Sequence, residues 1–177
     1  IRQARGLVLR GTSDDAETLG VLESAMRAYA RAGDLAHVNN VRYMMAAVAA
    51  ESPPDRDRAV RWAAECRAEA EAMFNAHEAA HARIVQATLR LDEAGDLGEL
   101  CDTFRQFGDL RCVHRVLMLR AEAAASDAER LAHLELAYEI ATAAQDQPRL
   151  VSTAERLVVA RDATGDVSAT LAALDRL

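Results

Sequence analysis

The eight residues Ala28-Tyr29-Ala30-Arg31-Ala32-Gly33-Asp34-Leu35 hold the end of one helix and the start of the next. Glycine adopts the left-handed backbone conformation that ends helices, and an aspartate side chain caps the first turn of a helix that follows. The order small residue, glycine, aspartate, apolar residue recurs at 94–97 and 164–167, and 107–110 varies it with phenylalanine in first position. This repetition predicts antiparallel helices joined by tight turns.

The composition favours helices throughout the chain. Of 177 residues, 39 are alanine, glycine and proline together number eleven, and aromatic residues make up 4%. Alanine has the highest helix propensity, whereas strands favour β-branched and aromatic residues. No stretch approaches the ~18 uninterrupted apolar residues of a membrane-spanning helix. We therefore predict an all-α fold that makes no contact with a membrane.

Apolar residues recur three and four positions apart along nearly the whole sequence, as on the buried face of amphipathic helices. The alternate turns, at Gly33, Asn75, Gly108 and Gln145, are 42, 33 and 37 residues apart, close to the period of helix-pair repeats. The predicted pairs are 14–32/35–50, 56–74/77–94, 97–107/110–125 and 127–145/147–163, and a last helix begins at Val167. The expected architecture is an α-solenoid of about nine helices.

The two ends of the sequence are periodic as well. Residues 1–12 are interpreted as the end of a preceding helix and a linker, and 13–177 as the repeat domain. We expect the chain to be a fragment of a longer helical array.

The spacing of Tyr29 from Gly33-Asp34 resembles the centre of a tetratricopeptide repeat, in which a tyrosine precedes the turn by four residues. Phe104 before Gly108-Asp109, and Ala141 before Gln145-Asp146, stand at matching places. Arrays of this kind, rich in alanine, arginine and Gly-Asp turns, resemble the C-terminal sensory regions of large actinobacterial transcriptional regulators and signalling NTPases. The resemblance implies a right-handed superhelix of helix pairs that binds partner proteins.

In tetratricopeptide-like arrays the first helix of each pair lines a concave groove. On this sequence, the resemblance places eight residues in the groove: Glu23, Arg27, Glu65, Glu69, Asp102, Arg105, Glu135 and Glu139. Six of these side chains are acidic, which favours a basic or arginine-containing peptide. The alternative is a solvated face with helical i,i+4 ion pairs, such as Glu23–Arg27, each worth only ~0.2–0.5 kcal/mol.

The string His77-Glu78-Ala79-Ala80-His81 is a candidate metal motif. On a helix it places two imidazoles one turn apart beside a carboxylate, as in zinc peptidases. Glu99, eighteen residues beyond His81, is the candidate third ligand. Arg83 counts against this hypothesis, because zinc peptidases have an apolar side chain at that position. We therefore predict a structural helix here and no enzyme, with a zinc-dependent hydrolase as the alternative.

The remaining features point away from catalysis and from nucleic acid. The net charge of −7 disfavours phosphate backbones, and no glycine-rich nucleotide-binding motif is present. Cys66, Cys101 and Cys112 fit reduced, buried thiols of a cytoplasmic protein. No cofactor is predicted.

The predicted function is an interaction or sensory module of a larger signalling or transcription-regulating protein, which contacts a peptide, a partner or other domains of its own chain. A regulatory domain that binds a small effector is the second alternative.

Overall fold

The structure is a computed structural model that describes residues 15–50, 55–90 and 95–163, and within them every regular element longer than one residue is an α-helix. The helices are α2 (Asp15–Arg31), α3 (Leu35–Ala49), α4 (Arg56–Ala72), α5 (Ala76–Leu89), α6 (Leu97–Gln106), α7 (Leu110–Ala123), α8 (Asp127–Ala143) and α9 (Gln147–Ala163). Each begins within one residue of its predicted start. The interpretation of residues 1–12 and the predicted helix from Val167 fall outside the described ranges. None of the described helices has the length and apolar character needed to cross a membrane.

Four of the turns share one hydrogen bond, although their sequences differ. The main-chain N–H of Asp34 donates to the carbonyl of Tyr29 (3.0 Å), and the same bond closes the α4–α5, α6–α7 and α8–α9 turns. In each turn the preceding residue has a positive φ, and these residues are Gly33, Phe74, Gly108 and Gln145. The predicted caps form as well: Asp34 and Asp109 each accept a hydrogen bond from a main-chain N–H three residues later. One turn geometry therefore joins the two helices of each predicted pair.

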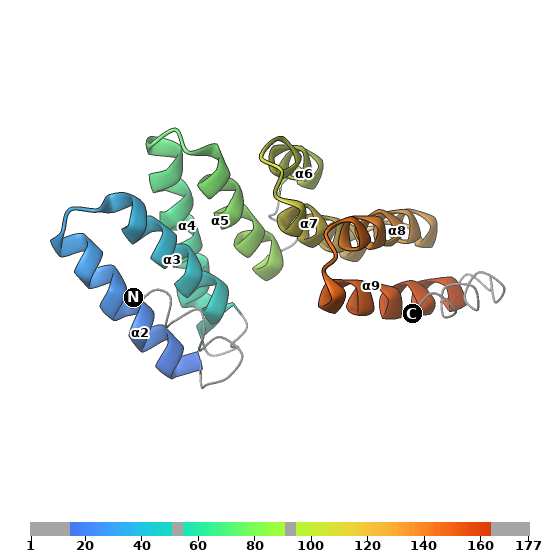
Figure 1. The fold of residues 1–177 in the computed structure, drawn as a ribbon, viewed down its shortest axis with the longest axis horizontal. Coiled ribbons are helices and arrows are strands. Elements are labelled where there is room, and N and C mark those ends of the chain that lie inside the picture. Colours follow the sequence, from blue (N-terminus) through green and yellow to red (C-terminus); the bar gives the residue numbers. More distant parts are fainter. Residues whose placement is uncertain (1–14, 51–54, 91–94, 164–177) are drawn as a thin grey trace. The chain divides into compact units, whose positions relative to one another are not determined.

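The chain divides into two compact units, an N-terminal unit that ends at Gly95 and a C-terminal unit that begins at Asp96. In the N-terminal unit each helix packs against the next, and α3 also contacts α5 (Figure 1). Leu22, Val41 and Met45 fill the core between α2 and α3. Farther along, Ala59 and Ala63 of α4 are fully buried. Their small side chains let the neighbouring helices approach closely.

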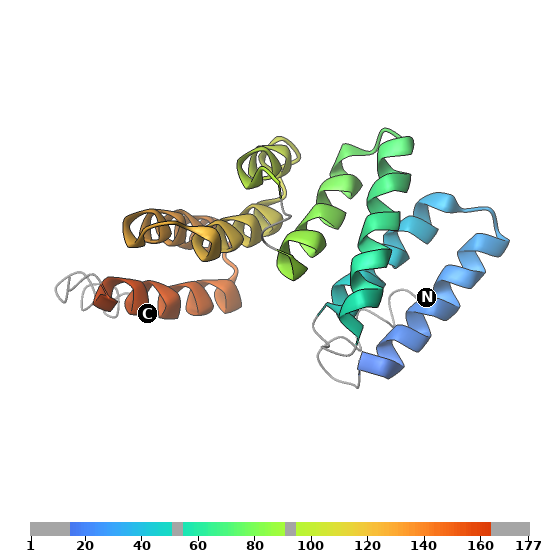
Figure 2. The same ribbon diagram turned by 180° about the vertical axis from the view of Figure 1, so that it is seen from behind.

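The C-terminal unit follows the same order of packing, with α6 on α7, α7 on α8 and α8 on α9 (Figure 2). Its core cluster consists of Ala121, Leu134, Leu157 and Ala160, with Tyr138 packed against it. Phe104 of α6 and Leu117 of α7 are also fully buried. Each unit therefore has a hydrophobic core of its own.

Candidate functional site

The two histidines of the candidate metal motif lie side by side on α5. Their ring centroids are 4.6 Å apart with the rings nearly perpendicular, and the ring of Tyr43 from α3 packs 5.1 Å from that of His81. His77 follows the helix start by one residue, and the Asn75 side chain caps this helix by accepting from the N–H of Glu78 (3.2 Å). Both imidazoles are half-buried. The prediction that the motif lies at a helix N-terminus is correct.

Glu78 of the same motif takes part in a buried polar network that joins three helices. The side-chain NH₂ of Asn39 on α3 donates to the Glu78 carboxylate (3.1 Å) and to the main-chain carbonyl of Cys66 on α4 (3.2 Å). The Cys66 thiol in turn donates to the main-chain carbonyl of Asn39 (3.6 Å). Sequence reasoning did not identify Asn39, although an asparagine among the apolar residues of a buried helix is a signal for a polar partner.

A small polar cavity adjoins this network. It has a volume of about 80 Å³ and is lined by Asn40, Tyr43, Cys66, Glu78 and His81. Since a water molecule occupies about 30 Å³ of liquid, the cavity has room for about two. A donor and acceptor set of this kind suits water or a small hydrated ion.

The N-terminal unit brings no third ligand to the histidine pair. Among its described residues, no aspartate, glutamate or cysteine side chain completes a close group of three ligand atoms with the two imidazoles. Glu99, the candidate third ligand, lies on α6 in the C-terminal unit, where its main-chain N–H is capped by Asp96 (3.1 Å). The zinc-hydrolase ligand set therefore stays a prediction.

The three cysteines are free thiols, two of them fully buried and Cys112 half-buried. Burial raises the pKa of Cys66 to about 12 and that of Cys112 to about 12, and it also raises the pKa of Cys101. A nucleophilic or metal-binding cysteine must lose its proton, so these thiols are poorly suited to either role at neutral pH.

The predicted groove residues of the N-terminal unit form ion pairs with neighbouring helices. Glu65 and Glu69 of α4 both bind Arg42 of α3, with 3.4 Å between the Glu65 carboxylate and the Arg42 Nε. Glu23 of α2 binds Arg58 of α4 (3.1 Å) and Arg27 on its own helix (3.8 Å). Each of these three carboxylates therefore has an arginine partner within the unit.

Sequence reasoning did not identify Arg42. Its side chain is only 15% exposed, although it carries a charge. A single charged residue, an arginine, in the otherwise uncharged stretch 38–50 is the signal that could have found it.

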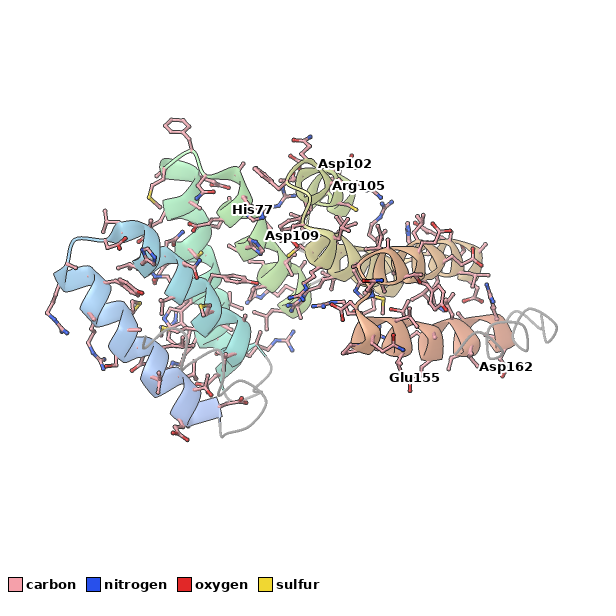
Figure 3. All side chains as sticks on the ribbon, viewed as in Figure 1. His77, Asp102, Arg105, Asp109, Glu155 and Asp162 are labelled. Carbon is pink, nitrogen blue, oxygen red and sulfur yellow. The ribbon has the colours of Figure 1, made fainter. Side chains whose placement is uncertain are left out.

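The predicted groove residues of the C-terminal unit are all exposed. Asp102 and Arg105 pair with each other along α6 (2.9 Å), and Glu135 of α8 binds Arg161 of α9 (3.0 Å). Glu139 is exposed on α8. Figure 3 labels Asp102 and Arg105 on α6.

A buried histidine in this unit has a structural role. The Nε2 of His114 on α7 lies 2.8 Å from the hydroxyl of Thr153 on α9, and this hydroxyl donates to the main-chain carbonyl of Arg149 (2.7 Å). The hydroxyl therefore accepts from His114, which requires a proton on Nε2. Burial, and then the nearby Arg149 guanidinium, lower the pKa of His114, so the neutral ring is favoured.

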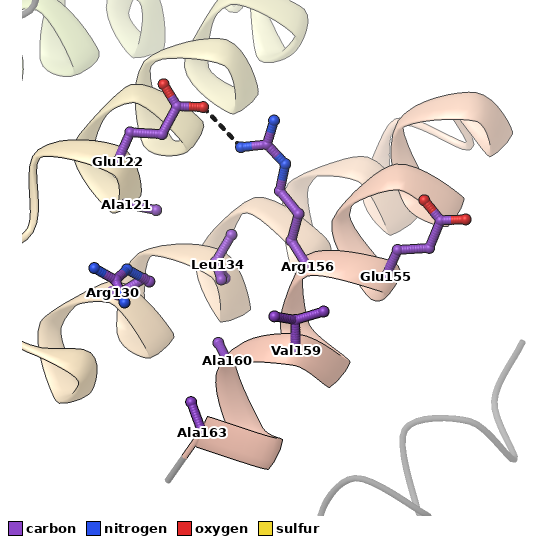
Figure 4. Close-up of a pocket in the computed structure, with 9 residues that line it drawn as sticks. All are labelled: Ala121, Glu122, Arg130, Leu134, Glu155, Arg156, Val159, Ala160 and Ala163. Carbon is purple, nitrogen blue, oxygen red and sulfur yellow. Dashed lines mark hydrogen bonds and ion pairs between the residues drawn. The ribbon is translucent and has the colours of Figure 1, made fainter.

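A pocket in the C-terminal unit has a volume of about 420 Å³ (Figure 4). Leu134, Val159 and three alanines form its apolar wall, whereas its charged residues include Arg156, which binds Glu122 of α7 (2.7 Å). This volume falls within the ~300–1,000 Å³ of small-molecule sites. Sequence reasoning raised a small effector but named none of these residues.

Phe74, in the α4–α5 turn, has two costly features at once. Its φ is +55°, in the left-handed region that glycine occupies in the α2–α3 and α6–α7 turns. Its ring is 96% exposed and contributes nothing to the core. Backbone strain of this kind costs about 1–3 kcal/mol and is frequent at functional sites.

Comparison of the chain with known protein families, with characterised proteins and with solved structures gives no significant match.

Proposed function

We propose that the chain is a protein-interaction module built from antiparallel helix pairs, arranged as a tetratricopeptide-like solenoid of about nine helices. Two observations support the architecture: the shared turn geometry within each pair, and the packing of each helix against the next inside both units. Repeats of this kind place each pair in contact with its neighbours, which leaves long surfaces for a partner. The proposed setting is a cytoplasmic signalling or transcription-regulating protein.

Phe74 carries the proposal of an interaction role. Glycine stands at the equivalent position in two of the other turns, at Gly33 and Gly108, so the turn itself does not require an aromatic ring. An exposed aromatic ring supplies a large contact area at low entropy cost, and aromatic residues are enriched at the energetic centres of protein interfaces. Phe74 is therefore the proposed anchor for a peptide or a partner domain.

Replacing Phe74 with glycine is expected to raise the stability of the N-terminal unit by about 1 kcal/mol, because the left-handed backbone is relieved and no buried contact is lost. Urea unfolding followed by Trp62 fluorescence measures this change. Gln145→Gly is the matched control, since it relieves the same strain in the C-terminal unit (φ +52°) without removing an aromatic ring. A less stable Phe74→Gly variant would contradict the expected relief of strain.

The interaction role is tested by selection from a displayed random-peptide library, with each protein immobilised through one terminus. Wild-type protein and Gln145→Gly are expected to enrich the same peptide motif, which Phe74→Gly does not retain. Because Phe74→Gly is expected to be the more stable protein, unfolding cannot explain its loss of binding. Enrichment of the same motif by Phe74→Gly would refute the anchor role.

A test of the predicted preference for basic peptides requires a variant in which the ion pairs are kept. Reversing Glu65 and Glu69 alone would place two new cations beside Arg42. The triple variant Arg42→Glu, Glu65→Arg, Glu69→Arg preserves the attraction and inverts the sign of the surface. It is expected to bind an enriched basic peptide at least tenfold more weakly, and unchanged affinity would show that this surface does not contact the peptide.

A regulatory site for a small effector is the second candidate, favoured by the 420 Å³ pocket beside Leu134 and Val159. A metabolite library screened by thermal shift tests it, because a ligand that binds the folded state raises the melting temperature. Val159→Trp, at a position of α9 that lines the pocket and is 70% exposed, places a large ring there and is expected to abolish any shift. A shift that persists in Val159→Trp would place the ligand elsewhere.

A further inference from the structure

We propose that His77 and His81 form a two-histidine chelate for one divalent late transition metal ion, such as Zn²⁺, Ni²⁺ or Cu²⁺. Figure 3 labels His77 near the start of α5. The two rings lie edge to face across one helical turn at a centroid distance of 4.6 Å, and each offers a ring nitrogen within 4.8 Å of the other. Imidazole nitrogens suit zinc, nickel and copper, whereas magnesium and calcium prefer oxygen ligands.

The surroundings of the pair favour a preformed site. Tyr43 packs against the His81 ring from α3, and the hydrogen bond from Glu78 N–H to Asn75 holds the first turn of α5. Two ligands on a rigid helix are already oriented, so little conformational entropy is lost when the ion binds. The 80 Å³ cavity that adjoins His81 has space for about two water molecules as further ligands.

The same geometry separates metal binding from peptidase chemistry. In the zinc-peptidase motif the central glutamate is the general base. Here the Glu78 carboxylate accepts a hydrogen bond from the side chain of Asn39, a fully buried residue of α3, so it is already engaged in the buried polar network. The inferred role is binding of the ion without hydrolysis, and it is independent of the peptide-binding proposal.

Calorimetric titration of the tag-free, metal-depleted full chain with Zn²⁺ tests the chelate. One ion per chain is expected, and His77→Gln and His81→Gln should each weaken binding at least tenfold, because either change leaves a single imidazole. His37→Gln is the matched control on α3, where His37 binds Asp34 rather than a second histidine. Its affinity should equal that of wild type.

Two further measurements make the outcome decisive. Glu78→Gln should bind Zn²⁺ as wild type does, and a loss equal to that of His77→Gln would overturn the two-histidine ligand set. The electron paramagnetic resonance spectrum of the Cu²⁺-loaded chain should show two nitrogen ligands in wild type and one in His77→Gln. Circular dichroism of the metal-free variants, recorded in the presence of a chelator, verifies that each variant is folded. Equal affinity of wild type and both single-histidine variants would refute the chelate and show adventitious binding.

Discussion

The Leu117→Asp variant is expected to unfold the C-terminal unit. Leu117 is fully buried in α7. The substitution removes apolar contacts worth about 2–5 kcal/mol and places a carboxylate at a fully buried position, which costs several kcal/mol more. The total stability of a domain is only about 5–15 kcal/mol, so a loss of this size leaves a unit of this length unfolded.

Two optical signals distinguish the units in this experiment. Trp62, the single tryptophan of the chain, lies on α4 in the N-terminal unit, whereas helices of both units contribute to far-ultraviolet circular dichroism. Leu117→Asp should lose roughly half of its helical signal and keep the unfolding transition of Trp62, because the N-terminal unit has a core of its own. Leu136→Asp is the matched control, since Leu136 is 42% exposed on α8 and its replacement should change stability by ~0.5 kcal/mol or less.

Either of two outcomes would contradict this expectation. An unchanged melting curve for Leu117→Asp would mean that α7 does not bury this face. Loss of the Trp62 transition would mean that the two units fold as one cooperative body. The second outcome would leave the core assignment intact and correct only the independence of the units.

The helices were predictable because the signals that start and end them are local. Gly33-Asp34 and Gly108-Asp109 combine the glycine that accepts a positive φ with the aspartate that caps the next helix, and both act within a few residues. The turn at Phe74 shows the limit of this reasoning. Its position was predicted from Asn75, but a phenylalanine in the left-handed region is disfavoured by local sterics and is visible only in the structure.

The contacts between helices were much less predictable. The eight expected groove residues were placed by analogy with a repeat family. The pairing of four of them with Arg42, Arg58 and Arg161 depends on how helices pack across 23 or more residues of sequence. From the sequence alone, a carboxylate on the first helix of a pair is assigned to an acidic surface, even where the structure places an arginine beside it. The sign of the groove therefore requires the tertiary structure.

The Asn39–Glu78 pair is also a contact between helices that the sequence alone does not reveal, and breaking it should strongly destabilise the fold. Asn39 is fully buried, and its NH₂ group donates to the Glu78 carboxylate at 3.1 Å. Asn39→Asp replaces this donor with a second carboxylate and removes the hydrogen bond to the Cys66 carbonyl. Two like charges in contact inside a helix bundle, together with a lost buried hydrogen bond, should lower the free energy of unfolding by about 3–5 kcal/mol at pH 7.

The effect should depend on pH with a defined sign. Burial beside Glu78 raises the pKa of the introduced carboxyl group in the folded state, so folding takes up a proton and stability falls as pH rises above the ordinary aspartate pKa of about 4. The loss in the free energy of unfolding of Asn39→Asp, relative to wild type, should therefore be largest at pH 7 and much smaller near pH 4. Urea unfolding at both pH values, followed by Trp62 fluorescence, measures the difference.

Two controls separate the like-charge contact from a simple loss of packing. Asn75→Asp makes the same chemical change at a helix cap, where a carboxylate accepts from the Glu78 N–H as the asparagine does, and it should be nearly neutral. The double variant Asn39→Asp, Glu78→Gln reverses the direction of the hydrogen bond, because the new amide can donate to the new carboxylate. It should recover at least half of the lost stability at pH 7. If it recovers none, or if the penalty is the same at both pH values, the repulsion between residues 39 and 78 is not what destabilises the variant.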